Sequence, residues 1–419
     1  MLSKDLIAGG VKSNIASLAL IHIGNYLIPL ITIPLILRSI GLEDFGRYSF
    51  LLSLCLYFSI LIEFGLTIPA TKYASENRGD ADLLSSQYFN VIAIKVFFTI
   101  ICLVLLIFSS MFIDLIDDNL SVLIILYGVV LSQAISPAWI YVGIECAKPY
   151  AMSVAISKIL YLALLLVFSE SIDVHKLAIF YSITSLFGSI LSIIYIFRRL
   201  KLKIKKAKLR DSLYLAIKSV DLFITTLFGS VYINFPSIII TITLGFEAVG
   251  VFSVCDKVIS AVKGLIQPVT QSLFPHFIKI NDQFSLSFIN KIKKLLVGYM
   301  IFSLAVASVL WTFADLIVEI VIGSPSDSTV DCLRAMCLLP LFFGISNILG
   351  NNVLLVLNLR KAYFYCLMWG SIFGVSAITV SALFYDVSAV GVSMVVTEII
   401  LCILMLDFIY KAKGVRGAL

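Results

Sequence analysis

The chain has 419 residues, of which 60% are apolar and only 13% are charged, with a formal net charge of +6. Long apolar runs separated by short charged segments are typical of a polytopic membrane protein, because a helix needs about 20 apolar residues to cross a bilayer. The runs are continuous rather than alternating, which excludes a transmembrane β-barrel. The eight cysteines are scattered without paired spacing, so we expect neither a disulfide framework nor a metal site.

Taken in chain order, the apolar runs predict twelve transmembrane helices. We place them at 13–37, 46–70, 86–111, 119–142, 150–169, 177–198, 214–242, 250–275, 294–322, 329–356, 362–384 and 388–410. The first run is too long for a signal peptide, so we expect it to be a retained span. Lys and Arg are concentrated in the terminal segments and in alternate loops, while the opposite loops carry mainly acids. The positive-inside rule therefore places both termini in the cytoplasm.

Two similar segments predict an internal repeat. Residues 40–49 and 244–253 both follow the pattern Ile/Leu-Gly-apolar-Glu-x-apolar-Gly-x-aromatic-Ser. Glycine adopts positive φ and lets helices approach closely, so these segments suit tight turns between spans. The predicted gating turns contain Gly41, Glu43 and Gly46 in the first copy and Gly245, Glu247 and Gly250 in the second.

The repeat and the span count together predict the fold class. We expect an all-α polytopic membrane protein with two parallel six-helix repeats around a central cavity, because six spans return the chain to the side from which it started. The N-terminal half is 1–200, a basic linker follows at 201–213, and the C-terminal half is 214–419. The simplest interpretation of the basic run 198–210 is a connector on the anionic inner leaflet; the alternative is recognition of a lipid headgroup.

Ionisable side chains inside spans are the main functional candidates, because burying a charge in a bilayer is costly. Asp256, Ser260, Lys263, Gln267 and Thr270 recur at helical spacing and share one helix face. We predict a substrate site formed by cavity cations and polar groups, comprising Lys95, Lys158, Lys257, Lys263, Asn25 and Gln267. Four deeper lysines outnumber two deeper carboxylates, which favours an anionic ligand, and lysine binds phosphate as a point charge.

The two deeper carboxylates, Glu63 and Asp256, are candidates for ion coupling. Asp256 has Lys257 beside it and Lys263 on its own face, so a structural ion pair is the alternative. Glu63 has no basic residue within two turns on its helix, which leaves it freer to exchange a proton. The alternative for Glu63 is a hydrogen bond to a neighbouring helix.

The sequence contains none of the common catalytic or phosphate-binding motifs, and we expect a non-enzymatic protein without a cofactor or nucleic-acid partner. Loops outside the predicted spans reach only about twenty residues, too short for a catalytic domain. A membrane-embedded polysaccharide polymerase stays open as an alternative, although such an enzyme is expected to carry a large periplasmic loop.

The twelve-span pattern and residues 26–48, which include Pro29, Pro34, Gly41 and Gly46, resemble the polysaccharide-transporter branch of the MOP (multidrug/oligosaccharidyl-lipid/polysaccharide) exporters, most closely bacterial O-antigen flippases. The resemblance implies export of undecaprenyl-pyrophosphate-linked oligosaccharides from the cytoplasmic to the periplasmic leaflet of the bacterial inner membrane by alternating access. It further implies membrane lipids, H⁺ or Na⁺ as a coupling ion, and other polysaccharide-assembly proteins as partners. A cation-coupled multidrug antiporter of the same superfamily is the alternative within transport, and the excess of lysines argues against it.

Overall fold

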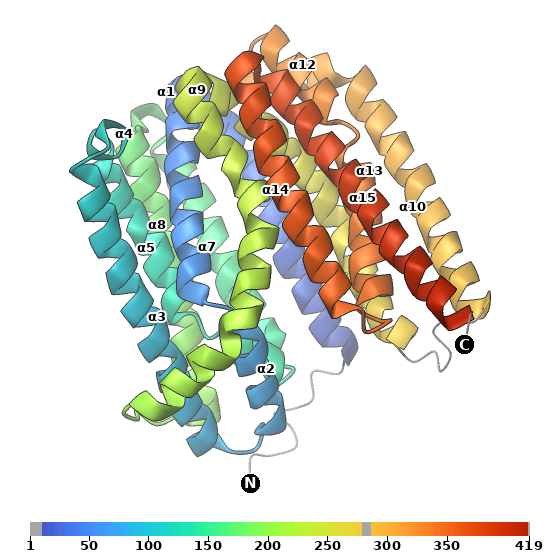
Figure 1. Ribbon diagram of the computed structural model, residues 1–419. Helices are drawn as coiled ribbons and strands as arrows, with labels where there is room; N and C mark the ends of the chain where they lie inside the picture. The colour runs from blue at the N-terminus through green and yellow to red at the C-terminus, as the bar shows by residue number, and fades with distance from the viewer. Residues whose placement is uncertain (1–10, 279–285, 418–419) are drawn as a thin grey trace. The chain divides into compact units, whose positions relative to one another are not determined.

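The computed structural model describes residues 11–278 and 286–417, and 88% of the chain is helical. No strand occurs in these two ranges (Figure 1). The helices are α1 (Val11–Glu63), α2 (Thr67–Glu76), α3 (Ala81–Ser110), α4 (Asp114–Asp117), α5 (Leu120–Ile135), α6 (Ala138–Gly143), α7 (Ala147–Val167), α8 (Val174–Leu200), α9 (Leu209–Ile278), α10 (Leu286–Thr312), α11 (Ala314–Ile322), α12 (Asp327–Met336), α13 (Leu339–Asn347), α14 (Arg360–Phe384) and α15 (Val387–Gly417). The predicted all-α membrane fold is confirmed.

Two glycines interrupt the two longest helices. Gly41 in α1 has φ 77° and ψ 177°, and Gly245 in α9 has φ 87° and ψ −178°. These φ values are readily available to glycine and strained for other residues. Eleven described segments are long and apolar enough to span a membrane, with Ile28–Glu63 counted once across Gly41. A second of these segments, Asn234–Gly264, likewise runs across Gly245.

Several predicted spans are interrupted where the backbone departs from the α-helix. The span predicted at 46–70 ends at Glu63, because Phe64 and Gly65 adopt φ values of 44° and 65°. The span predicted at 119–142 breaks between α5 and α6 at Pro137, which has no N–H and disfavours helix at the preceding residue. The span predicted at 329–356 contains α12, α13 and a π-helical segment, Ile348–Leu354.

The described helices form two compact units. Unit 1 contains the residues up to Ile28 and Tyr48–Ser230, and unit 2 contains Pro29–Arg47 and the residues from Val231 onward. Helices α1 and α9 therefore each contribute to both units. The predicted halves were 1–200 and 214–419. Residues 29–47 lie in the predicted N-terminal half but belong to unit 2, and residues 214–230 lie in the predicted C-terminal half but belong to unit 1. The arrangement as two six-helix repeats stays a prediction.

Within unit 1, α5 packs against α3 and α8, and α7 packs against α8 (Figure 1). A buried hydrophobic cluster lies at the end of unit 1 that carries α2. Its members come from α2, α3, α6, the end of α8, the linker and the start of α9: Leu66, Ala70, Ala74, Leu84, Tyr88, Val91, Ile94, Trp139, Ile140, Tyr141, Ile196, Leu200, Leu202 and Leu215. Within unit 2, α15 packs against α12, α13 and α14.

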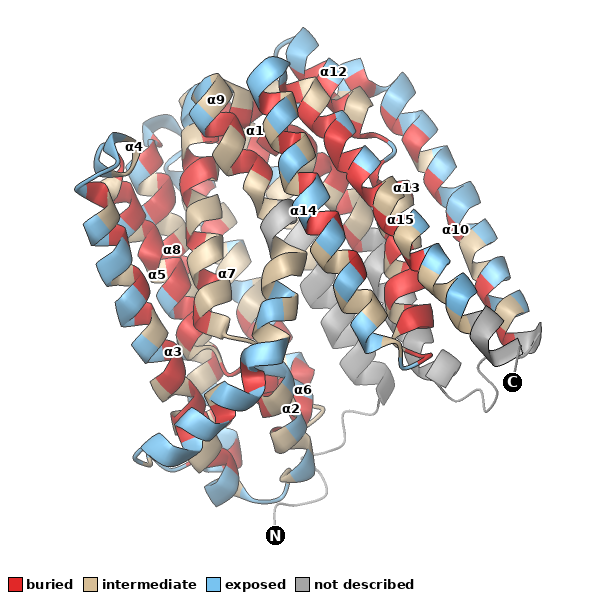
Figure 2. Ribbon diagram, viewed as in Figure 1, coloured by how far each residue is buried: buried red, intermediate tan, exposed pale blue. Residues whose placement is uncertain are grey.

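Exposed residues lie along the outward faces of several helices (Figure 2), and many of them are large and apolar. On α3, Phe97, Ile100 and Val104 are each more than half exposed. They recur at i, i+3 and i+7, so they form one continuous stripe along the helix. Continuous apolar stripes of this kind are unfavourable in water and suit contact with lipid. The protein is therefore a multi-pass membrane protein.

The two similar segments of the sequence contact each other inside unit 2, and the contact is reciprocal. A Cβ atom at Gly46 would overlap the Phe246 carbonyl and lie 2.6 Å from the Gly250 amide nitrogen. A Cβ atom at Gly250 would overlap the Leu42 carbonyl. Leu42 and Phe246 occupy the same position in their respective copies, as do Gly46 and Gly250. Each glycine thus admits the backbone of the other copy, which explains why both copies require glycine here.

We predict that Gly46→Ala and Gly250→Ala each destabilise the protein, because the added methyl group overlaps backbone atoms that have no room to move. Overpacking of this kind costs about 1–3 kcal/mol. Thermal unfolding of the detergent-purified protein, followed by tryptophan fluorescence, measures the effect. Gly298→Ala is the matched control, since a Cβ atom at Gly298 meets nothing within 4 Å. Equal stability of Gly46→Ala and Gly298→Ala would contradict the close approach.

Candidate functional site

The first candidate cluster lies in unit 1, where the end of α1 faces α3. Lys95 Nζ on α3 lies 2.7 Å from Glu63 Oε2, and the Thr67 hydroxyl donates to Glu63 Oε1. The Lys95 side chain is 4% exposed and that of Glu63 is 32% exposed. A lysine this deeply buried in a bilayer span requires a partner, and Glu63 provides it. The partner comes from another helix, as in the alternative in which Glu63 hydrogen-bonds a neighbouring helix. The role of Glu63 in ion coupling stays a prediction.

The backbone break that follows Glu63 packs against α9. The Phe64 ring stacks between those of Phe98 and Phe223, with centroid separations of 4.5 and 4.6 Å. A Cβ atom at Gly65 would lie 2.6 Å from the Phe223 nitrogen and 2.8 Å from the Ser219 carbonyl oxygen. Positive φ at Phe64 and Gly65 thus turns the chain into α2, and the α9 backbone approaches Gly65 closely.

Lys158, the second predicted cation of unit 1, is half-buried on α7. Its position within a 21-residue apolar helix agrees with the predicted intramembrane location. Burial alone assigns no ligand to it, so its role as a substrate contact stays a prediction.

The second candidate cluster lies in unit 2, around Lys263 on α9. Lys263 Nζ lies 4.8 Å from the centroid of the Phe343 ring, a distance at which the ring face attracts an ammonium group. Asp256 and Glu398 both act electrostatically on Lys263. The ion pair of Asp256 is with its neighbour Lys257, at 3.9 Å. Lys263 therefore combines an aromatic contact with two carboxylates at longer range.

Glu398 on α15 was missed in the sequence. Its side chain is 1% exposed, and the Ser346 hydroxyl donates to Glu398 Oε2 at 2.7 Å. The sequence does show Glu398 as a single carboxylate in the last apolar run, ahead of Asp407. Because an ionisable residue inside a span is costly, this position alone could have identified Glu398 as a candidate. With Glu398, the described spans contain a third deep carboxylate beside Glu63 and Asp256.

The remaining predicted residues fall into two groups. Asn25 and Gln267 lie outside the residues whose side chains the structure describes. Of the six residues of the predicted gating turns, Gly46 and Gly250 are buried and form the reciprocal contact of unit 2. A Cβ atom at Gly41 or Gly245 would meet nothing within 4 Å, and Glu43 and Glu247 are exposed. Their geometry suits a close helix crossing, and a gating role stays a prediction.

The comparisons with known proteins decide the family. A family model described as "Polysaccharide biosynthesis protein" matches residues 11–281, which is more than half of the chain. The chain belongs to this family. It is 25% identical over 408 residues to a protein of Escherichia coli (strain K12) named "Putative O-antigen transporter", with 96% of this chain and 97% of that protein covered. A Shigella dysenteriae protein of the same name is 24% identical and covers 94% of this chain and 99% of its own.

Solved structures show the same fold. An inward-facing multidrug resistance MATE family transporter of the MOP superfamily has a TM-score of 0.69 at 11% identity, with 96% of this chain and 98% of that chain covered. A MOP superfamily transporter from Pyrococcus furiosus has a TM-score of 0.59 at 13% identity, with 99% of each chain covered. The predicted resemblance to polysaccharide transporters is confirmed by the family and by these relatives, and the solved MOP superfamily transporters share the fold. The relatives are named as transporters, in agreement with the prediction of a non-enzymatic protein.

We predict that Lys95→Met destabilises the protein by about 1–3 kcal/mol, because it leaves Glu63 partly buried without its charge partner. The double variant Glu63→Gln/Lys95→Met should recover most of this loss, since no unpaired charge remains. A double-mutant cycle of thermal unfolding measures the coupling energy.

The exposed pair Lys72–Glu76, separated by 3.9 Å, provides the control. Lys72→Met should change stability by less than about 0.5 kcal/mol, as is usual for solvent-exposed pairs. Additive single-variant effects for Glu63 and Lys95 would show that the two side chains do not interact.

Proposed function

We propose that this transporter is a flippase that moves undecaprenyl-pyrophosphate-linked O-antigen or related oligosaccharide units from the cytoplasmic to the periplasmic leaflet of a bacterial inner membrane. The observation that carries the proposal is the full-length similarity to two proteins named as O-antigen transporters. The fold of alternating-access MOP transporters supports the mechanism, because inward-facing and outward-facing members both match the chain. Both termini would face the cytoplasm, as the distribution of Lys and Arg predicts.

The intramembrane lysines suit the proposed substrate. A pyrophosphate carries negative charge that must be stabilised when it leaves the headgroup region, and Lys95, Lys158, Lys257 and Lys263 are placed in apolar helices. Asn25 and Gln267 would add hydrogen bonds to the glycan. Lys263 fits this role, because among the described residues its ammonium group contacts the Phe343 ring and forms no close ion pair that a phosphate would have to displace.

An H⁺ or Na⁺ gradient would give the transport its direction, with Glu63 or Asp256 as the coupling carboxylate. Because Glu63 is paired with Lys95 at 2.7 Å, coupling through Glu63 requires this pair to open and close during the cycle. Glu63→Gln in vesicles under an imposed gradient tests the role, and a full gradient response in the variant would exclude it.

Lipid-linked units should accumulate in the cytoplasmic leaflet when the gene is deleted, and surface polysaccharide should be lost. Leaflet location is measured in spheroplasts with an enzyme or label that cannot cross the membrane. Wild-type protein restores export, and an inactive variant does not. Accumulation of single units already in the periplasmic leaflet would indicate the polymerase alternative, while unchanged polysaccharide with altered drug resistance would indicate the multidrug antiporter.

We predict that Lys158→Ala and Lys263→Ala each reduce export at least about tenfold at normal protein abundance, if each contributes a charge-assisted contact to phosphate. Lys158→Arg or Lys263→Arg should restore part of the activity, because the positive charge is retained. Export is measured as surface polysaccharide per transporter molecule.

Lys291→Ala is the control, since Lys291 is exposed near the start of α10. Normal export by both Lys158→Ala and Lys263→Ala would remove these lysines from the proposed substrate site.

A further inference from the structure

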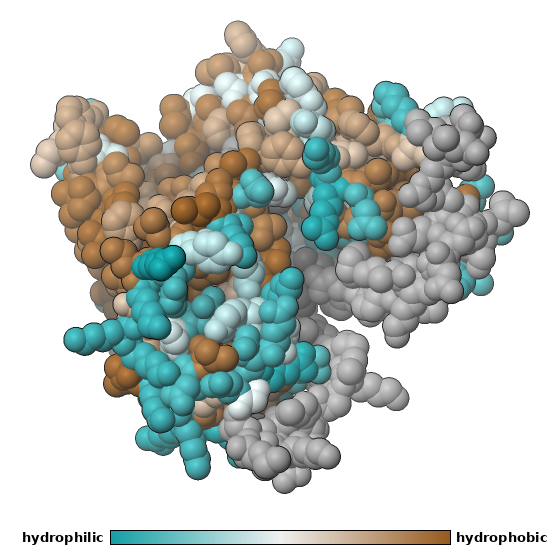
Figure 3. All heavy atoms as spheres, turned by 60° about the horizontal axis from the view of Figure 1, so that its bottom comes forward, coloured by the Kyte–Doolittle hydropathy of each residue, from teal (hydrophilic) through white to brown (hydrophobic). Residues whose placement is uncertain are grey.

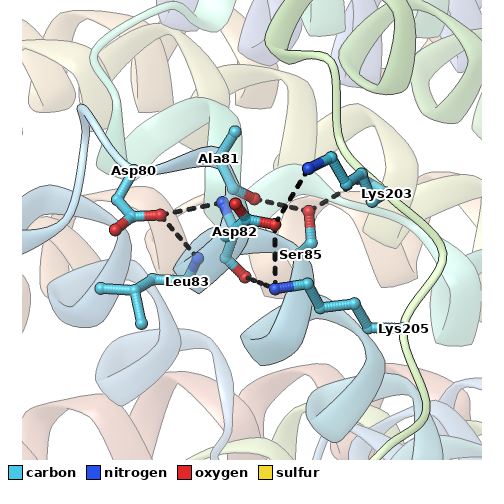
Figure 4. Close-up of polar contacts among 7 residues, drawn as sticks. All are labelled: Asp80, Ala81, Asp82, Leu83, Ser85, Lys203 and Lys205. Carbon is cyan, nitrogen blue, oxygen red and sulfur yellow. Dashed lines mark hydrogen bonds and ion pairs between the residues drawn. The ribbon is translucent and has the colours of Figure 1, made fainter. Parts of the chain in front are cut away.

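The segment that joins α8 to α9 is a fixed part of unit 1 rather than a loose linker. We call residues 201–208 the basic strap. Leu202 is buried in the cluster of unit 1, and the Lys203 amide donates to Ser85 Oγ at 3.0 Å (Figure 4). The Lys208 amide donates to Asn90 Oδ1 at 2.8 Å. Three points along the strap are therefore held, two of them by side chains of α3.

One carboxylate adds a side-chain clamp to these contacts. Asp82 Oδ1 lies 3.0 Å from Lys205 Nζ and 3.6 Å from Lys203 Nζ (Figure 4). Lys205 Nζ also donates to the Asp82 carbonyl at 2.9 Å. Asp80 caps α3 by accepting from the Asp82 and Leu83 amides, which fixes the backbone of the clamp. Each contact is modest in water, and together they define the course of the strap.

In the part of the chain that the structure describes, the ion pairs with Asp82 involve only Lys203 and Lys205, so most of the positive charge in this region is exposed. Within the described residues, the ion pairs of the strap go to Asp82. The other cations of the strap and of the adjoining helix ends are exposed: Arg198, Arg199, Lys201, Lys206, Lys208 and Arg210. Hydrophilic side chains gather on this end of unit 1 (Figure 3). The surface thus presents a cluster of cations on a held backbone.

Large aliphatic side chains are exposed among these cations. Ile204 is 87% exposed and Leu209 is 79% exposed. Leu213 and Ile217 continue the stripe from Leu209 along one face of α9 and are 59% and 66% exposed. Because the strap connects the end of one apolar span with the start of the next, it must lie at a membrane surface. Cations beside exposed aliphatic groups are typical of segments that bind at the lipid interface.

We propose that the basic strap, with Arg198, Arg199 and Arg210, is a binding site for the headgroups of anionic phospholipids. The guanidinium groups suit bidentate contact with a phosphodiester, and the lysines add positive charge. Ile204 and Leu209 insert at the boundary between headgroups and acyl chains. A cluster of this size next to a membrane span binds anionic lipid through the surface potential as well as through contacts. The site stands independently of the transported substrate.

The experiment measures lipid binding by full-length protein purified in detergent. Phosphatidylglycerol and phosphatidylcholine with identical acyl chains are added, and bound lipids are counted by native mass spectrometry. We expect preferential retention of phosphatidylglycerol, falling with added salt because exposed charges are screened. Lys201→Gln/Lys206→Gln/Lys208→Gln should weaken apparent affinity for phosphatidylglycerol at least about tenfold. The corresponding triple substitution by Arg should retain it.

The matched control is Lys291→Gln/Lys293→Gln/Lys294→Gln, which removes the same charge from exposed positions on α10. It should keep the wild-type preference for phosphatidylglycerol. Equal loss in the strap variant and the control would overturn the proposal, because net charge rather than the strap would then govern binding. Equal occupancy by inorganic phosphate at the same concentration would overturn the assignment to lipid. Retained binding by the strap variant would overturn both.

Discussion

The hydrocarbon core of a bilayer offers no hydrogen-bond partners to the backbone, and this constraint governs the structure. Helices satisfy their own N–H and C=O groups, so the described chain is almost entirely helical. The breaks within spans then need compensation from neighbouring elements. At Phe64 and Gly65 the turn keeps backbone hydrogen bonds, because the Phe64 amide donates to the Ile60 carbonyl and the Leu66 amide donates to the Glu63 carbonyl. Aromatic rings of α3 and α9 enclose the turn. At Gly41 and Gly245 the break is followed by the reciprocal contact of the two similar segments.

The same constraint explains which features the sequence could predict. The all-α membrane class and the positive-φ glycines follow from local composition, since apolar length and glycine spacing are visible without a partner. The ends of the spans were less well predicted. The break at Pro137 has a local cause that the sequence analysis overlooked, whereas the positive φ of Phe64 depends on what packs around it. The division into compact units was also beyond sequence reasoning, since α1 and α9 each contribute to both units and only tertiary contacts reveal this.

The candidate site likewise has features that the sequence predicted and features that it did not. The cost of intramembrane charge identified Glu63, Lys95 and Lys263 as residues that need an explanation. It did not identify their partners, because Glu63 meets Lys95 across 32 residues of sequence and Lys263 meets the ring of Phe343 on another helix. Glu398 escaped notice since it stands alone in a long apolar run, although Ser346 on α13 holds its carboxylate in place.

These partners change the argument for an anionic substrate. Glu398 adds a third deep carboxylate, and the charge of Lys95 is balanced by Glu63. The number of lysines in the spans therefore does not by itself favour an anionic substrate. What distinguishes the lysines is the strength of the partner that a phosphate must displace. Lys95 would have to leave a charged partner at 2.7 Å, whereas Lys263 would leave the face of an aromatic ring. Cation–π contacts are weaker than close ion pairs in a poorly solvated site. For the proposed pyrophosphate substrate, Lys263 is therefore the better candidate contact, and the Lys95–Glu63 pair is better suited to hold α1 against α3.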